Sequence, residues 1–251
     1  MTIGSAIFNV YRDLARPRDK KNRVGHYPHQ VLDEIPILFN IRALKVLNAF
    51  LEYKERSLIT RQSGKVQFYN VSASINNFTN DKKRIAENNI MRATVSSNFL
   101  NKTLLKTNWI FYLLHPKGRF ALSGNVGPMD ATQLNPLTEP MGPASIKKGN
   151  LNGVEFELEG SNYNMTGDIK VLYNELKVAL LEKDKGATET DKKFLMSFLA
   201  NLVIKNANPK ENEEARIAKV NYARDINRSI FNLCWKTLFE GIRQTVGIKK
   251  K

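Results

Sequence analysis

The sequence contains a single cysteine, Cys234, among its 251 residues. One cysteine can build neither an internal disulfide nor a thiolate metal site, so the fold must depend on its apolar core. Long apolar runs are missing as well, because the longest, Phe194 to Ile204, is too short to span a bilayer. The first apolar stretch has no basic region before it, as a secretory signal would. We therefore expect a cytoplasmic or virion protein, neither secreted nor inserted into a membrane.

Histidine is scarce, and the sequence signatures of common catalytic sites are absent. His26 and His29 lie close together in a polar segment that contains prolines, without cysteine or a His-Glu pair nearby, which is typical of a solvated loop rather than a metal site. No phosphate-binding loop, dinucleotide fingerprint or nucleophile elbow occurs. We expect a non-enzymatic protein without catalytic residues, bound metal or cofactor.

One acidic pattern keeps a nuclease hypothesis open. Glu155, Glu157 and Glu159 alternate with apolar residues, so they share one face of an expected strand, and Asp168 and Lys170 follow. Carboxylates can hold a divalent ion while a nearby lysine positions water. A solvated acidic strand face explains the same residues, and we favour that interpretation.

Acidic residues are few in comparison with basic ones. The chain has 39 Lys and Arg against 24 Asp and Glu, a formal net charge of +15. The excess is uneven: residues 61–122 hold ten basic and two acidic residues, whereas residues 151–190 hold four basic and eight acidic ones. A basic surface attracts polyanions, so nucleic acid becomes the leading partner class.

The apolar spacing predicts a mainly α fold with a small β-hairpin. Ile41, Leu44, Leu47 and Leu51 have helical spacing. Helices are likewise expected around residues 81–106, 168–183, 188–204 and 211–246, and strands at 65–75 and 153–160.

The hairpin is expected between Lys106 and Leu122, around a Pro-Lys-Gly turn. Trp109 and Phe111 point to one face of its first strand and Ile110 and Tyr112 to the other, so one pair should fill the core.

Breaks in composition predict two lobes. We expect an extended basic arm at 1–34, a basic N-terminal lobe at 35–122, a Pro/Gly-rich linker or long loop at 123–150, and a mainly helical C-terminal lobe at 151–251 that ends in a basic tail.

The favoured function is sequence-independent binding and packaging of single-stranded nucleic acid, RNA rather than DNA. A viral nucleocapsid or coat-type protein, a homo-oligomer that assembles through its termini, would use many phosphate contacts. The expected groove has one basic wall from each lobe. The first wall is Lys82, Lys83, Arg84, Arg92, Lys102, Lys106, Lys117 and Arg119, and the second is Arg216, Lys219, Arg224 and Arg228.

Two other protein classes fit part of the pattern. Residues 41–122 could form a winged-helix DNA-binding domain of a replication initiator or transcription regulator, with a recognition helix at residues 90–104 and the hairpin as wing. The positive charge could instead serve solubility or attachment to acidic lipids. We rank the lipid hypothesis last, because no basic helix has an aromatic lipid-facing side.

Overall fold

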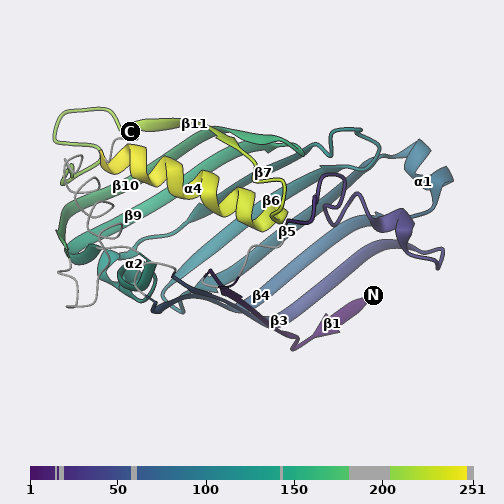
Figure 1. Ribbon diagram of the computed structural model, residues 1–251, viewed down its shortest axis with the longest axis horizontal. Coiled ribbons are helices and arrows are strands. Elements are labelled where there is room, and N and C mark those ends of the chain that lie inside the picture. Colours follow the sequence, from purple (N-terminus) through teal and green to yellow (C-terminus); the bar gives the residue numbers. More distant parts are fainter. Residues whose placement is uncertain (15, 17–19, 58–60, 142–143, 181–203, 248–251) are drawn as a thin grey trace.

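A computed structural model shows one large sheet with a long C-terminal helix across one of its faces (Figure 1). The structure describes residues 1–14, 16, 20–57, 61–141, 144–180 and 204–247. The helix expected at 188–204 lies almost entirely outside these residues.

The sheet has eleven strands, and its main path runs β1-β3-β4-β5-β6-β7-β9-β10-β11. Strands β1 and β2 both pair in parallel with β3, and β8 pairs with β9. All other neighbours are antiparallel. The strands are β1 (Thr2–Gly4), β2 (Ile7–Asp13), β3 (Asn40–Arg56), β4 (Ser63–Thr79), β5 (Ile90–Phe99), β6 (Thr103–Tyr112), β7 (Phe120–Val126), β8 (Met129–Asp130), β9 (Ala144–Gly160), β10 (Asn164–Leu180) and β11 (Ile217–Ala223).

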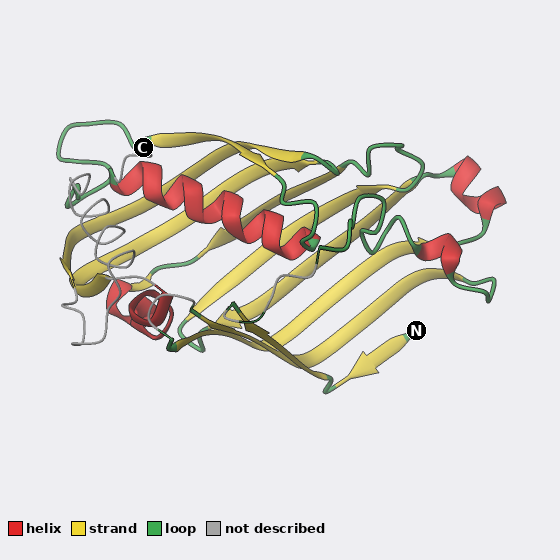
Figure 2. Ribbon diagram, viewed as in Figure 1, coloured by secondary structure: helices red, strands yellow, loops and turns green. Residues whose placement is uncertain are grey.

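The helices within the described residues are short except for the last one. They are η1 (Leu32–Glu34), α1 (Lys82–Glu87), η2 (Ala131–Leu134), α2 (Asn135–Met141) and α4 (Ile230–Val246). Ser229 caps α4 by accepting a hydrogen bond from the backbone of Asn232, and Gly247 ends it with φ 92°. Figure 2 shows α4 lying across the strands.

The mainly α, two-lobe expectation is wrong. Strands from both sides of residues 123–150 pair directly, since β7 is hydrogen-bonded to β9, and the sheet is continuous across this segment. The segment itself contains the end of β7, then β8, η2, α2 and the start of β9. The expected arm supplies two edge strands and then folds onto the helix-bearing face, where Tyr27 is buried.

The hydrophobic core lies between α4 and the last strands. Ile169 on β10 and Leu233 on α4 are fully buried, and Phe120 and Leu122 of β7 join them. The helix approaches β10 closely at Gly241, where an added Cβ would come within 2.4 Å of the Ile169 side chain. We call this face of the sheet the helix side.

Several long strands carry one extra residue that shifts the alternation of their side chains. The β3–β4 register changes between Val46 and Leu51, and Asn48 and Asn70 adopt positive φ there. The β9–β10 register changes beside Glu175, which also has positive φ. Such bulges bend a strand and re-aim the side chains beyond them.

The expected helix around Ile41 to Leu51 and those at 81–106 and 168–183 are mostly strands. Residues 41–55 belong to β3, and 168–180 belong to β10. Only the short α1 is helical in the second region, which continues as β5 and β6. The region 211–246 divides into β11 and α4.

The strand and hairpin predictions are confirmed. β4 and β9 include the two expected strands. β6 and β7 form the hairpin. Of the two side-chain pairs on its first strand, Trp109 and Phe111 are the pair that packs against the core.

Candidate nucleic-acid interface

The face opposite the helix side is polar and exposed. Cross-strand pairs place one row of residues across its full width: Lys45, Ser74, Thr94, Asn108, Ser123, Glu157, Asp168 and Lys219. The neighbouring row contains Asn76, Arg92, Ile110, Ala121, Glu159, Thr166 and Asn221. Thr94 and Asn108 are exposed, so no described element covers the middle of this face. We call it the open face.

The open face over β2 to β6 carries cations that have no ionic partner. These are Lys45, Lys54, Lys65, Arg92 and Lys106, which are all exposed. None of them forms an ion pair with a residue that the structure describes. We call this region the cationic half. Because no described carboxylate forms an ion pair with them, these charges are available to an anionic ligand.

Aromatic side chains lie among these cations. Tyr11, 58% exposed, has its ring 6.0 Å from the Lys54 Nζ. The rings of Phe50 and Tyr69 contact each other edge to face, with centroids 5.1 Å apart. All three residues are on the open face by the strand registers. Flat rings beside cations are the combination on which the bases and phosphates of a single strand bind.

The open face over β9 to β11 is acidic, and three of its carboxylates form ion pairs. Arg119 Nη2 lies 2.9 Å from Glu159, Lys170 Nζ lies 3.3 Å from Glu155, and Lys219 Nζ lies 3.2 Å from Asp168. We call this region the acidic half. The expectation that Glu155, Glu157 and Glu159 share a strand face is confirmed.

The acidic half gives the nuclease hypothesis no support. Asp168 and Lys170 lie within β10, where each forms an ion pair, and not at a helix start. Within the part of the chain that the structure describes, no group of three or more His, Cys, Asp or Glu residues could hold a metal ion.

The first expected wall is brought together only in part. Lys82, Lys83 and Arg84 are on α1, which connects β4 to β5. They therefore lie at the end of the sheet where β5 begins, near Arg92. The β6–β7 turn, with Lys117 and Arg119, reaches the same end. Lys102 is in the β5–β6 turn at the opposite end, and Lys106 is on the open face.

Arg224 of the second wall is a structural residue, only 7% exposed. Its guanidinium donates hydrogen bonds to the carbonyl groups of Arg23 (2.8 Å), Arg228 (3.0 Å) and Asn162 (3.2 Å). It also lies 4.1 Å from the centroid of the Tyr27 ring, a cation–π contact. Arg224 thus joins three chain segments and cannot contact a phosphate.

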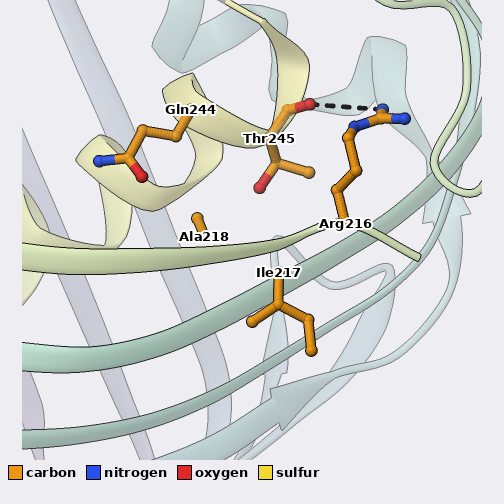
Figure 3. Close-up of a pocket in the computed structure, with 5 residues that line it drawn as sticks. All are labelled: Arg216, Ile217, Ala218, Gln244 and Thr245. Carbon is orange, nitrogen blue, oxygen red and sulfur yellow. Dashed lines mark hydrogen bonds between the residues drawn. The ribbon is translucent and has the colours of Figure 1, made fainter. Parts of the chain in front are cut away.

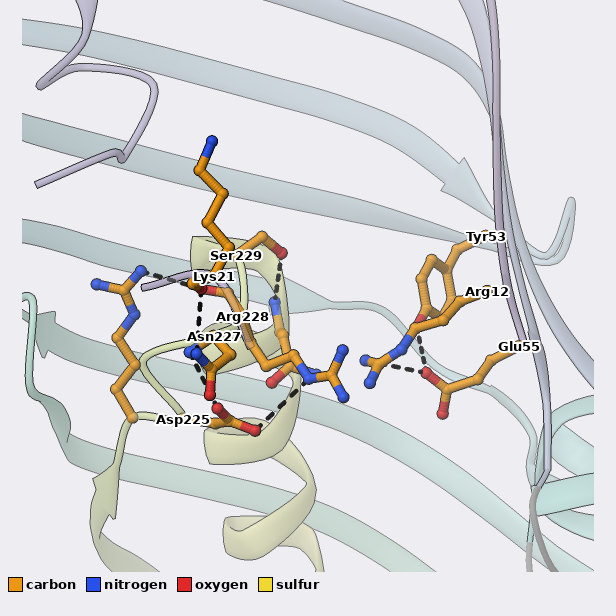
Figure 4. Close-up of polar contacts among 10 residues, drawn as sticks. Arg12, Lys21, Tyr53, Glu55, Asp225, Asn227, Arg228 and Ser229 are labelled. Carbon is orange, nitrogen blue, oxygen red and sulfur yellow. Dashed lines mark hydrogen bonds and ion pairs between the residues drawn. The ribbon is translucent and has the colours of Figure 1, made fainter. Parts of the chain in front are cut away.

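Arg228 and the adjacent loop hold the N-terminal arm in place. Arg228 pairs with Asp225 at 3.5 Å, and Asn227 donates to the carbonyl of Lys21 at 3.1 Å (Figure 4). On the other side of the view, Arg12 pairs with Glu55 at 3.6 Å, and Tyr53 donates a hydrogen bond to the same carboxylate.

Arg216 lines a shallow cavity of about 340 Å³ between β11 and the end of α4 (Figure 3). Its guanidinium donates to the carbonyl groups of Ala207 (2.6 Å) and Thr245 (3.4 Å) and to the Tyr173 hydroxyl (3.3 Å). These bonds hold the end of α4 against the sheet. With Arg216 and Arg224 engaged and Lys219 paired, the second wall of the groove does not form.

His29 is buried, which corrects the solvated-loop interpretation. The side chain is 2% exposed, and its ring centroid lies 4.9 Å from that of Phe111. Burial lowers the pKa of His29 to about 4 because the charged imidazolium is desolvated. His26 is exposed, as expected.

Sequence reasoning missed Lys45, Lys54 and the aromatic residues of the cationic half. The apolar spacing in this segment predicts a helix with its charged residues on the side away from the core. On such a helix, Lys45 and Lys54 share no surface with Lys106. Only strand pairing shows that Lys45 shares a row with Thr94 and Asn108.

The comparisons with known proteins identify no relative. No protein-family model matches the chain, and neither a curated protein nor a solved structure matches it. Among the described residues, no helix combines the length and apolar character needed to cross a membrane.

Proposed function

We propose that the protein binds single-stranded nucleic acid without sequence specificity through the cationic half of the open face. The observation that carries the proposal is a set of cations without an ion pair among the described residues, Lys45, Lys54, Lys65, Arg92 and Lys106. They lie beside the exposed ring of Tyr11 and the partly buried rings of Phe50 and Tyr69. Lysine and arginine neutralise phosphates, and the aromatic rings stack with bases of any identity.

The neutral residues of this face suit the same ligand. Ser72, Ser74, Thr94, Ser96, Asn98 and Asn108 surround the cations. Hydroxyl and amide groups donate hydrogen bonds to phosphate and sugar oxygens, contacts that carry little sequence information. A broad polar sheet face therefore favours binding with slight sequence preference.

The winged-helix alternative is not retained. It requires a recognition helix at residues 90–104, and these residues form β5, a turn and the start of β6. A single strand lying on the sheet needs no helix in a major groove.

A packaging role remains part of the proposal. A homo-oligomeric nucleocapsid or coat-type protein, working in the cytoplasm or in a virion with RNA as its ligand, would use this kind of phosphate-dominated contact on every copy.

The test is the binding of a labelled oligouridylate of about 15 nucleotides, followed by fluorescence anisotropy across salt concentrations. If all the cations of the cationic half contact phosphates, the log–log salt slope should be about −3.5. Arg92→Gln with Lys106→Gln should lower the slope to about −2 and weaken binding about tenfold or more near 50 mM salt.

The matched control is Lys170→Gln with Lys219→Gln, which removes the same charge from the acidic half. It should leave the slope unchanged, because these lysines are paired with carboxylates. Equal weakening by both double variants, or no binding by the wild type at low salt, would overturn the proposal. Replacing oligouridylate with oligodeoxythymidylate tests the preference for RNA.

A further inference from the structure

The outermost strand beside the cationic half, β2, is exposed and apolar. Ile7 is 70% exposed, Phe8 51%, Val10 49% and Tyr11 58%. Edge strands of monomeric proteins are commonly blunted by lysine, proline or a bulge, and the segment from Ile7 to Tyr11 has none of these. The strand is thus an open template for pairing with another strand.

Its hydrogen bonds to β3 show which backbone groups face outward. The carbonyl of Ala6 accepts from the amide of Phe50 at 2.8 Å, and the amide of Leu14 donates to the carbonyl of Arg56 at 3.1 Å. In a parallel ladder alternate residues bond to the same neighbour, so the even-numbered residues of β2 bond to β3. The amides and carbonyls of Ile7, Asn9, Tyr11 and Asp13 therefore point away from the sheet.

The charges of β2 are compatible with a second copy of the same strand. Arg12 pairs with Glu55, and Asp13 pairs with Arg56 at 3.5 Å, within one chain. Neither residue needs a partner from outside, and the strand adds no net charge to its edge. Like-charge repulsion thus does not oppose pairing between identical strands.

We propose that two copies of the chain associate through antiparallel pairing of their β2 strands about a two-fold axis at Val10. This register sets Ile7 opposite the second copy's Asp13 and Asn9 opposite its Tyr11, which pairs the outward amides and carbonyls of Asn9 and Tyr11. On the helix side, Val10 lies opposite Val10 of the second copy, and Phe8 lies opposite Arg12 of the second copy. The contact is isologous, so it closes as a dimer.

The dimer would create one continuous ligand surface, a consequence that rests on the proposed function. Because β2 borders the cationic half, the two-fold axis places both cationic halves side by side and leaves both acidic halves at the outer ends. A strand of nucleic acid long enough to cross the axis would contact both copies, whereas a short strand would contact one.

The first test is sedimentation of the full chain at about 50 μM, where a dimer of this class should be populated. Asn9→Pro removes an amide that points away from β3, so it should lower the association constant at least tenfold and leave β3 pairing intact. Asn9→Ala keeps the amide and should remain dimeric. A wild-type monomer at this concentration, larger open-ended assemblies, or equal association of Asn9→Pro and Asn9→Ala overturns the dimer.

A second test reads the register and does not depend on how proline is tolerated. Non-hydrogen-bonded antiparallel partners have Cα atoms about 4.5 Å apart, within disulfide range, so Val10→Cys should form a covalent dimer when copper–phenanthroline oxidises the two thiols. Phe8→Cys is the matched control, because its two copies would lie about 14 Å apart along the strands. The native Cys234 is buried and gives little background. Equal cross-linking of both variants, or none for Val10→Cys, overturns the register.

Failure of the dimer and failure of nucleic-acid binding give different results. If Asn9→Pro is monomeric and the wild type is dimeric, the interface stands even when no oligonucleotide binds. If both functions hold, Asn9→Pro should weaken binding of a strand of about 40 nucleotides more than that of a strand of about 10 nucleotides.

Discussion

On the helix side of the sheet, Arg216 and Arg224 are enclosed by carbonyl groups, whereas on the open face Arg92 and Lys106 are exposed and form no ion pair with any residue in the described part of the chain. The basic residues on the helix side therefore stabilise the fold, whereas those of the cationic half are available to a ligand. Charge counts along a chain cannot separate them. The comparison predicts that changes on the helix side alter stability and changes on the open face alter binding.

The largest effect is expected for Arg224→Ala. Loss of this guanidinium leaves buried carbonyl groups of three segments without a donor and should lower the free energy of unfolding by about 4 kcal/mol. Urea unfolding measures it. Arg92→Ala, the same replacement on the open face, should change stability by less than about 0.5 kcal/mol. Equal losses would remove the distinction between the two faces.

The pH dependence of stability offers a second test of the helix side. The pKa of His29 is about 4 in the folded protein, below the ordinary value of 6.5. The unfolded chain therefore binds a proton at a higher pH than the folded one, and stability should fall as pH falls from 6.5 to 4, by about 3 kcal/mol. His29→Leu should flatten this part of the profile. His26→Leu, at an exposed position, should preserve it.

Aromatic stacking should produce a smaller effect, confined to the open face. Tyr11→Ser removes an exposed ring beside Lys54 and should weaken oligouridylate binding by about 1–2 kcal/mol. The unfolding free energy should change little. Tyr163→Ser removes another exposed ring, outside the cationic half, and serves as control. If both variants bind alike, Tyr11 does not contact a base.

The smallest effect is expected in the acidic half. Lys219 is 82% exposed and its partner Asp168 is 50% exposed, so solvent screens their ion pair. Lys219→Ala should alter the unfolding free energy by less than about 0.5 kcal/mol and leave oligouridylate affinity unchanged. A clear loss of affinity would extend the binding surface beyond the cationic half.

The hairpin and the second half of β9 could be predicted, because their side chains alternate without interruption, in β9 from Val154 to Gly160. The long strands could not, for a specific reason. Leu44 and Leu51 of β3 both face the helix side although they are an odd number of positions apart, because the bulge at Asn48 shifts the alternation by one. Ile169 and Leu176 of β10 share the core in the same way around Glu175.

Two side chains seven positions apart lie on the same face of a helix, because seven residues make about two turns. They also lie on the same face of a strand when one bulge falls between them. Apolar spacing alone therefore cannot distinguish the two. Once β3 was taken as a helix, Lys45 and Lys54 could not be assigned to the surface that contains Arg92. The Asn residues with positive φ, Asn48 and Asn70, are a signal that could have favoured bulged strands.

The hydrogen bond between Arg224 and the carbonyl of Arg23 joins residues 201 positions apart in the chain. Contacts of such separation form late in folding, since most of the intervening chain must be ordered before the ends can meet. The N-terminal arm is synthesised before β11 and α4, so its hydrogen bond to Arg224 can form only after residue 224 has been added to the chain. During synthesis the arm can already pair with β3 and pack against Phe120, but its hydrogen bonds to Arg224 and Asn227 form last, and a chain that ends before residue 224 lacks them.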